Sequence, residues 1–347
     1  YEPSLPNHVV DLNGSVNLEM IWVEPGTFTM GSPVTESGRS SNEMEHNVSL
    51  TKGFYLGKYE VTQAQYEAVM TGNTDGLSAS PSQWSNNPNR PVENVSWDDS
   101  QIFLIRLNES EYSAGRLANG WRYSLPTEAQ WEYACRAGSN TRYSFGNTIS
   151  PSHANYFSSG YSQTRNVGQY SANFWGFYDI HGNVWELTSN WLGNYEGGLQ
   201  IDPSGSLSGT HKATRGGSWQ TVTSSMRVAR RGFDYPFTRK NIVGFRLAYK
   251  QVSVPPSDLE SLSALTIVEN QPVGTIVGEF NATDPDANAT LTYSLVDGNG
   301  STDNSLFTLD ANGTLTTTTS FDYESNGSSY SIRVQAKDEY NATVEKD

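Results

Sequence analysis

The chain has 347 residues, with 37 acidic and 22 basic side chains and a formal net charge of −15. This charge excludes nucleic acid and anionic membrane surfaces as partners favoured by electrostatics, because no counterion release would accompany binding to phosphate. The single cysteine excludes a disulfide scaffold and a cysteine-rich zinc site. No apolar run approaches the ~20 residues that cross a bilayer. A hydrophobic share of 35% with 12% aromatic residues predicts a globular chain with polar surfaces and many turns.

The negative charge is concentrated at the C-terminal end. Residues 258–347 contain 15 acidic and 3 basic side chains, a net −12, and all nine Trp residues precede position 250. Two proline residues, Pro255 and Pro256, mark the change in composition and are typical of a short, stiff linker. We therefore predict an N-terminal domain over 1–252, a linker over 253–261 and a C-terminal domain over 262–347.

Helix start signals in the N-terminal domain predict three helices. Thr62 precedes a helix over Gln63–Met70, and Ser96 precedes an apolar stretch that runs through Leu107. Thr127 opens a capping box before Trp131–Ala137, and Gly138 supplies the stop. Long segments rich in Gly, Asn, Ser and aromatic residues separate these helices, and such segments are typical of a fold pinned by metal or function.

A series of motifs runs through the N-terminal domain, at Met20–Ser32, Gly53–Met70, Arg90–Trp97, Leu125–Gly138, Gly176–Trp191, Arg215–Trp219 and Val243–Tyr249. In this order they resemble the formylglycine-generating-enzyme (sulfatase-modifying factor) domain family over about residues 15–250. The resemblance implies an α+β fold, a variant of the C-type-lectin fold with much irregular structure.

Copper chemistry does not fit these residues. The resemblance implies that enzymes of the family oxidise a substrate cysteine with copper held by two cysteines just after the Gly-Gly-Ser segment. Here Thr221 and Ser224 or Ser225 stand at those positions, and a hydroxyl cannot replace the thiolate that Cu(I) selects. The lone Cys135 lies inside a predicted helix, where a core role is expected. We identify no catalytic residues, since the five His residues show no ligand spacing and no nucleophile elbow or phosphate-binding loop occurs.

Two features of the N-terminal domain suggest binding. The segment 179–186 resembles the family's calcium loop, which implies side-chain ligands from Asp179 and Glu186 and main-chain carbonyl ligands from Gly182 and Val184. A plain turn is the alternative, and we expect His181 to be packed or hydrogen bonded rather than a ligand. A second family calcium site would begin at 155–156.

The other feature is the segment from Trp219 to Asn241, which in this fold shapes a surface cleft. Aromatic side chains with Arg and Asp would suit recognition of a protein or a sugar. The alternative is that the aromatic residues of this segment, Phe233 among them, belong to the core. The candidate cleft residues are Trp219, Gln220, Arg231, Asp234, Tyr235 and Phe237.

The C-terminal domain consists of short β-branched runs separated by turn residues. The segment Asp310–Gly313 is a hairpin turn. The pattern predicts a small antiparallel sandwich of ~7 strands, immunoglobulin-like in size. The predicted strands cover 265–268, 275–280, 291–295, 307–309, 314–316 and 330–334.

Acidic residues stand at the ends of these strands with a spacing that suits calcium. Pairs two residues apart place carboxylates on one side of an extended loop, where a cation that takes 6–8 oxygens can use both. The alternative is that the acids merely solvate loops and protect strand edges. Together the acids resemble the motifs of the cadherin repeat, although that family's Asp-x-Asn-Asp-Asn linker is missing. The candidate calcium ligands are Glu269, Asp284, Asp286, Asp322, Glu324 and Asp338.

These observations predict an exported, non-catalytic calcium-binding surface protein that acts in adhesion, matrix or filament assembly. We expect calcium and no copper as cofactor, and a secreted or cell-surface location, since the chain opens at Tyr1 without Met and carries ten Asn-x-Ser/Thr sequons. One expected partner is a protein or glycan ligand. Neighbouring copies are also expected partners, through strand exchange, because the last strand is incomplete. That strand is either cut short or completed by another chain. The alternative is a protein-modifying enzyme, such as a formylglycine-generating-enzyme-like oxidoreductase, that acts without the copper cysteine pair.

Overall fold

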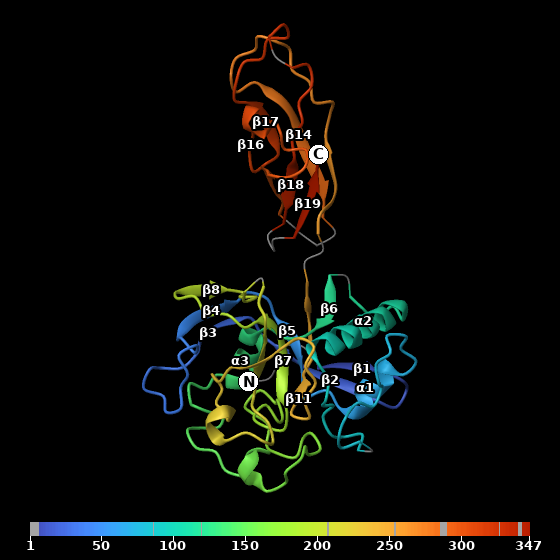
Figure 1. Ribbon diagram of the computed structural model, residues 1–347, viewed down its shortest axis with the longest axis vertical. Helices are drawn as coiled ribbons and strands as arrows, with labels where there is room; N and C mark the ends of the chain where they lie inside the picture. The colour runs from blue at the N-terminus through green and yellow to red at the C-terminus, as the bar shows by residue number, and fades with distance from the viewer. Residues whose placement is uncertain are drawn as a thin grey trace. The chain divides into compact units, whose positions relative to one another are not determined.

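The computed structural model describes residues 7–85, 87–118, 120–206, 208–252, 255–284, 290–325, 327–338 and 342–347. The chain divides into two compact units, Tyr1–Gln251 (unit 1) and Val252–Asp347 (unit 2), and each is treated by itself (Figure 1). Within the described residues, none of the helices combines the length and the apolar character that a membrane crossing needs. Asp286, one of the candidate calcium ligands, lies outside the described residues.

The three predicted helices of unit 1 are confirmed, and each begins at the expected residue. They are α1 (Gln63–Met70), α2 (Trp97–Ser113) and α3 (Glu128–Arg136). Thr62, Ser96 and Thr127 each form a reciprocal capping box with the third residue of the helix. Helix α2 runs past the expected end at Leu107 to Ser113, and these added turns bury Glu111, which pairs with Arg116 at 2.5 Å. Helix α3 ends in a left-handed Ala137, one residue before Gly138.

The strands of unit 1 form three small sheets that surround these helices. Their orders are β1-β2-β5-β12-β6, β10-β9-β7-β11 and β3-β4-β8. All pairs are antiparallel except β11–β7 and β4–β8. The bounds are β1 His8–Asp11, β2 Asn17–Val23, β3 Gly26–Met30, β4 His46–Leu50, β5 Phe54–Gly57, β6 Trp121–Ser124, β7 Trp185–Trp191, β8 Leu199–Ile201, β9 Lys212–Arg215, β10 Gly232–Asp234, β11 Val243–Phe245 and β12 Ala248–Gln251, with short 3-10 helices at Phe157–Ser159 and Thr223–Met226.

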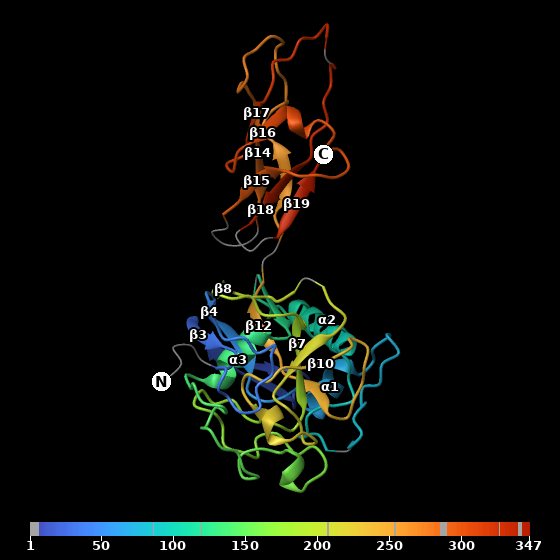
Figure 2. The same ribbon diagram turned by 60° about the vertical axis from the view of Figure 1, so that its left-hand side comes forward.

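Two large apolar clusters form most of the core of unit 1, and a smaller one lies around Tyr143 and Tyr156. One packs α1 and α2 against β11, with Tyr66 stacked on Phe103 and both rings against Phe245. The other surrounds Trp131 of α3, which is completely buried. Strand β10 is the edge of its sheet, next to β9, so one of its two edges pairs with no described strand (Figure 2).

Unit 2 is an all-β sandwich of a four-stranded and a three-stranded antiparallel sheet. The sheet orders are β13-β14-β17-β16 and β15-β18-β19. The predicted hairpin turn is present, with the Gly313 N–H donating to the Asp310 carbonyl at 3.0 Å and Gly313 at φ 97°. The bounds are β13 Ser257–Ser261, β14 Ile276–Thr283, β15 Thr292–Leu295, β16 Phe307–Leu309, β17 Thr314–Thr317, β18 Val334–Lys337 and β19 Thr343–Lys346, with a 3-10 turn at Asn304–Leu306.

Three boundaries in unit 2 differ from the expectation. Residues 257–261, expected in the linker, pair with β14 as strand β13. The predicted strand at 265–268 is extended chain outside any sheet, and the predicted strand at 330–334 becomes regular only from Val334. β-branched composition predicts extended backbone, but a strand also needs a paired strand. Among the described residues, 265–268 make no backbone hydrogen bond to another strand, and the N–H groups of Ser331 and Arg333 donate to side chains instead.

Candidate functional site

An exposed row of aromatic side chains follows the edge strand β10. Phe233, Tyr235 and Phe237 are 54%, 48% and 68% exposed, so the structure decides against the alternative that they are core residues. Strand β10 ends at Asp234 and the chain turns at 236–237, and the rings of Tyr235 and Phe237 stack with their centroids 5.5 Å apart. His211, which precedes β9, joins them, with its ring centroid 4.2 Å from Tyr235 and 5.0 Å from Phe233. We call His211, Phe233, Tyr235 and Phe237 the aromatic ridge.

His211 was not among the residues expected in the cleft. It is brought to the ridge because β9 and β10 pair with Lys212 opposite Asp234. The preceding residue therefore lies next to the end of β10. Only the pairing of β9 with β10 identifies His211 as a neighbour of the ridge, and the sequence does not specify that pairing.

Charged pairs flank the ridge. Asp234 forms an ion pair with Lys240, and Arg239 donates two hydrogen bonds to Asp99 at the start of α2. The Asp98 N–H donates to the carbonyl of Pro236 at 3.0 Å and ties the ridge segment to the same helix. The ridge thus combines apolar ring surface with polar groups on a fixed backbone.

The remaining cleft candidates lie elsewhere or are buried. Trp219 packs edge-on against Trp84 and donates to the Asn241 carbonyl at 3.1 Å, while Gln220 is exposed. Arg231 is only 2% exposed, and its guanidinium pairs with Glu128 at 2.6 Å. The expectation that Arg231 offers a charge to a ligand is therefore wrong, because that charge is already neutralised inside the unit.

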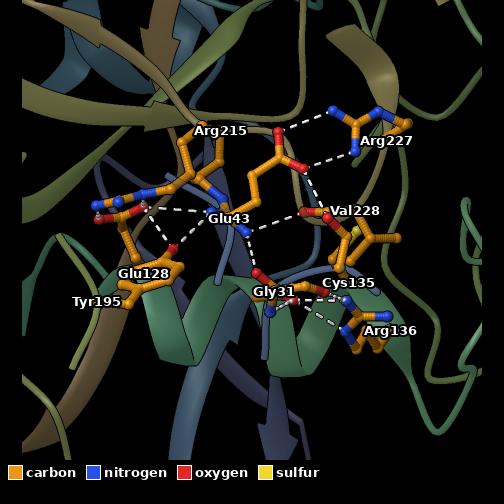
Figure 3. Close-up of polar contacts among 12 residues, drawn as sticks. Gly31, Glu43, Glu128, Cys135, Arg136, Tyr195, Arg215, Arg227 and Val228 are labelled. Atoms are coloured by element: carbon orange, nitrogen blue, oxygen red, sulfur yellow. Dashed lines mark hydrogen bonds and ion pairs between the residues drawn. The ribbon is translucent and has the colours of Figure 1, made fainter. Parts of the chain in front are cut away.

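A network of buried ion pairs holds the segment that leads to the ridge (Figure 3). Arg215 of β9 has a fully buried side chain and pairs with Glu128 at 3.2 Å and with Glu132, both on α3. Burial raises the pKa of Glu128, but the Arg231 and Arg215 guanidiniums outweigh burial and hold that pKa below its ordinary value. On the other side, Arg227 pairs with Glu43 at 2.7 Å. These contacts fix β9 and residues 227–231 against α3.

In the region expected to hold copper in the family, the hydroxyl of Thr221 is already engaged. The Thr221 hydroxyl donates to the Ser218 carbonyl and accepts from the Ser218 N–H, both at 2.9 Å. Cys135 is completely buried, and burial raises the pKa of its thiol well above the ordinary range. His181 lies 3.9 Å from that sulfur and is hydrogen bonded on both ring nitrogens, to Met226 and Ser144. The donor set here does not fit copper.

The segment 179–186 forms a tight buried loop around acidic side chains. Asp179, Gly182 and Asn183 all have positive φ. Burial raises the pKa of Asp179 to about 6. Glu186 accepts two hydrogen bonds from Arg246, at 2.8 and 3.0 Å, and one from the Trp131 indole at 2.7 Å.

A third buried carboxylate, Glu60, completes this loop and was not expected. It accepts from the Val184 N–H at 3.1 Å and from the Asn183 amide at 2.7 Å. Its pKa is raised well above the ordinary value, first by burial and then by Asp179 and Glu186. The oxygen donors suit calcium in type, and Arg246 competes with any cation for Glu186. The assignment of Asp179, Gly182, Val184 and Glu186 as calcium ligands stays a prediction.

Three of the acidic residues predicted in unit 2 do come together. Carboxylate oxygens of Glu269, Asp322 and Glu324 all lie within 4.8 Å of one another. Asp338 is 2% exposed and accepts from the Ala342 N–H at 2.8 Å. Asp284 follows the end of β14 and is not part of the three-residue cluster. The cluster brings together oxygen donors of the type that calcium takes, and its assignment as a calcium site stays a prediction.

Comparison with known proteins identifies the families that the two units resemble. The model of the sulfatase-modifying factor enzyme 1-like domain matches residues 10–251, and the cadherin domain model matches residues 263–346. Among solved structures, Treponema denticola variable protein 1 is 28% identical with a TM-score of 0.61, over 71% of this chain and 99% of that one. PvdO from Pseudomonas aeruginosa is 26% identical with a TM-score of 0.59, over the same shares.

Curated relatives carry several names. The serine/threonine-protein kinase pkn1 of Chlamydia caviae is 31% identical over 249 residues, which cover 66% of this chain and only 38% of that protein. The formylglycine-generating enzyme of Bos taurus is 25% identical over 309 residues, covering 71% of this chain and 79% of the enzyme. The chain belongs to the sulfatase-modifying factor enzyme 1-like family, and this domain is followed by a cadherin domain.

Proposed function

We propose that this protein is an exported, calcium-binding surface protein whose head, unit 1, recognises a protein or glycan ligand through the aromatic ridge. Adhesion, matrix building or filament assembly is the role that this layout serves, with neighbouring copies as further partners through strand exchange at unit 2. The observation that carries the proposal is the ridge itself: three aromatic rings, each about half exposed or more, on the edge strand β10 and in the turn that follows it.

The ridge has the properties of a recognition surface. Covering a half-exposed ring removes apolar surface worth on the order of 1 kcal/mol, and several adjacent rings add to that gain. Because the backbone of β9 and β10 is held by buried ion pairs, a ligand would lose little free energy in ordering it. Aromatic rings with adjacent charged pairs suit both protein and sugar ligands.

Calcium binding and export rest on other features. The carboxylate cluster of Glu269, Asp322 and Glu324 supports a cation site in unit 2, and Asp179 with its neighbours supports one in unit 1. Cadherin domains suggest an extracellular or cell-surface location, which supports secretion or surface display. Removal of calcium is tested below.

The second candidate is a protein-modifying enzyme, such as a formylglycine-generating-enzyme-like oxidoreductase, that acts without the copper cysteines. The match to the bovine enzyme over 71% of this chain favours it. The engaged hydroxyl of Thr221 and the deeply buried Cys135 count against a thiol-based route. Recognition is therefore the better supported function.

The test is a pair of ridge variants, Tyr235→Ala and Phe237→Ala, screened with the native chain on a glycan array and an array of purified extracellular proteins. We expect each variant to lose at least about tenfold in affinity for whatever ligand the native chain binds, because each loses a central aromatic contact. The control is Phe174→Ala, which removes a ring that is 89% exposed and lies outside the ridge. Equal affinity of ridge variants and control would reject the ridge as the binding site.

A further inference from the structure

A small polar pocket lies in unit 1 between Arg90 and the segment 161–169. Its cavity has a volume of about 220 Å³. Sites for small molecules usually measure roughly 300–1,000 Å³, so this pocket suits one compact chemical group rather than a whole large ligand. We call it the arginine pocket. Its lining residues are Arg90, Tyr161, Gln163, Thr164, Arg165, Asn166 and Gln169.

The lining of the pocket carries two positive charges and no negative one. Arg90 donates to the side-chain carbonyl of Gln163 at 3.2 Å, while Arg165 donates to the Tyr170 hydroxyl at 3.2 Å and lies over the Tyr161 ring. All three partners are uncharged. Within the described part of the chain, neither guanidinium lies within ion-pair distance of a carboxylate, whereas the fully buried arginines of unit 1 each pair with a glutamate.

Acidic residues near the pocket do not occupy it. Burial raises the pKa of Glu93 and of Asp179, and the guanidiniums of Arg90 and Arg165, respectively, partly offset that effect. Both carboxylates are buried, and neither lines the pocket. The net charge of −15 does not oppose an anion here either, because −12 of it belongs to residues 258–347. The pocket therefore presents its positive charge to a ligand.

The backbone that carries these side chains is held by two buried asparagines. Asn183 accepts a hydrogen bond from the Arg165 N–H at 2.9 Å and donates one to the Arg165 carbonyl at 3.2 Å. Asn155 donates to the Gln163 carbonyl at 2.9 Å, and the side chain of Gln163 in turn holds Arg90. Because this frame is already formed, a ligand would lose little free energy in ordering it.

Two polar atoms of the lining residues have no hydrogen-bond partner. The Nε of Arg90 and the hydroxyl of Thr164 are both buried, and no described residue bonds to either. Buried polar groups in folded proteins are almost always hydrogen bonded, so these two atoms indicate that a polar partner belongs here. Two guanidiniums without a counter-charge also repel each other, and an anion between them would relieve that repulsion. The occupant that fits the pocket is therefore polar and negatively charged.

We propose that the arginine pocket binds one acidic sugar unit of a glycan, with its carboxylate or sulfate on the two guanidiniums. A planar guanidinium forms paired hydrogen bonds with either group. The amides of Gln163, Asn166 and Gln169 both donate and accept, as sugar hydroxyls do, and the half-exposed Tyr161 ring adds apolar surface. An acidic peptide would use a strand edge, and none of residues 161–169 belongs to a strand. The pocket shares no residue with the aromatic ridge.

The experiment titrates the full chain with glucuronate, a sulfated glucose, neutral glucose and inorganic sulfate, and measures each affinity by saturation-transfer NMR. We expect at least one of the two acidic sugars to bind at least about tenfold more tightly than glucose, because hydrogen bonds to a charged guanidinium are the stronger kind. The tighter of the two identifies carboxylate or sulfate as the negative group. Glucose binding as tightly as both acidic sugars would overturn the charge requirement, and inorganic sulfate binding as tightly would overturn recognition of a sugar.

Two variants with matched controls place the acidic sugar in the pocket. Arg165→Gln should lose at least about tenfold in affinity, while Arg122→Gln, which removes an arginine outside the pocket, should bind like the native chain. Gln169→Glu puts a negative charge on an exposed lining residue, so the fold is retained and the affinity should fall by a similar factor. Gln271→Glu makes the same change on an exposed residue of unit 2 and should have no effect. Native affinity in Gln169→Glu would overturn the proposal.

The ridge variants separate this proposal from the proposed function. Tyr235→Ala and Phe237→Ala should bind the acidic sugar like the native chain, because neither residue lines the pocket. Loss of acidic-sugar binding in these two variants would overturn the pocket as a separate site. No binding of either acidic sugar by the native chain would overturn the pocket and leave the ridge proposal intact, so the two proposals fail separately.

Discussion

Buried charged residues of unit 1 are costly to disturb one at a time. Arg246 is fully buried and pairs with Glu186, while burial, Asp179 and Glu186 raise the pKa of Glu60. The Arg246 guanidinium also lowers the pKa of Glu60 and of Asp179, so it acts on all three acidic groups. Breaking a buried pair costs more than the pair itself contributes, because the partner is left charged and unpaired.

Replacing Arg246 with Met should therefore destabilise the protein strongly. We expect the free energy of unfolding of unit 1 to fall by about 3–5 kcal/mol, measured by urea denaturation. The control is Lys58→Met, which breaks the partly exposed pair with Glu19 and should cost less than about 1 kcal/mol. Equal losses in the two variants would show that burial of the Arg246 pair adds nothing.

The buried carboxyl group of Glu93 should make the unfolding free energy of unit 1 depend on pH. Its side chain is completely buried, one oxygen accepts from the Trp84 N–H at 3.3 Å, and burial raises its pKa to about 7. Because the folded-state pKa lies above the unfolded value of about 4.5, the folded chain binds the proton more tightly. The stability that this proton supplies is complete below about pH 4.5 and is lost as pH rises to about 7.

Glu93→Gln should remove this dependence. We expect the native chain to lose about 2 kcal/mol of unfolding free energy between about pH 5 and about pH 8 from this group, and the variant to lose correspondingly less. Thermal melts at both pH values measure the difference. Glu67→Gln, at an exposed position on α1, should keep the native slope. An identical slope in Glu93→Gln would exclude a proton on Glu93 as the cause.

At the scale of elements, α3 connects the core to the candidate recognition surface. One face of the helix buries Trp131, and its Glu128 and Glu132 hold Arg215 of β9 and Arg231 next to β10. The start of the helix therefore sets the position of the carboxylates that anchor the ridge. The capping box of Thr127 and Gln130 determines that start.

Thr127→Ala should destabilise unit 1 by about 1 kcal/mol, because the Gln130 N–H loses its capping acceptor. Thr127→Ser retains a hydroxyl and should stay within a few tenths of a kcal/mol of the native chain. Chemical denaturation of the three proteins measures both values. A loss in the Ser variant as large as in the Ala variant would point to the threonine methyl group rather than to the cap.

At the scale of the whole molecule, we expect calcium to stabilise unit 2. The carboxylate cluster of unit 2 leaves three negative charges within 4.8 Å of one another, and a bound cation would relieve their repulsion. Cation concentrations about a hundredfold above Kd would add about 2.7 kcal/mol to the unfolding free energy.

We therefore expect EDTA to lower the melting temperature of unit 2 by about 5 °C or more relative to millimolar calcium, as seen by calorimetry. The double variant Asp322→Asn with Glu324→Gln should lose this response. The control Glu279→Gln, an exposed acid on β14, should keep it. The same melting temperature in EDTA and calcium would reject the cluster as a calcium site.

The sequence by itself determined those features that depend on neighbouring residues. The capping boxes at Thr62, Ser96 and Thr127 fixed three helix starts, and the composition change near Pro255 separated the two units. The motif order was sufficient to identify the family. Each of these signals is local, because a cap, a turn or a motif is complete within a few residues.

Only the tertiary structure decided which candidate residues meet. Arg246 reaches Glu186 and His211 reaches Tyr235, pairs separated by long stretches of chain, and Arg231 is buried although its neighbours on the ridge are exposed. The exposure of an aromatic or charged side chain depends on which strand lies at the edge of a sheet, and that is set by non-local pairing. The predicted strand at 265–268 lies outside any sheet for the same reason, since a β-branched segment becomes a strand only where another strand pairs with it.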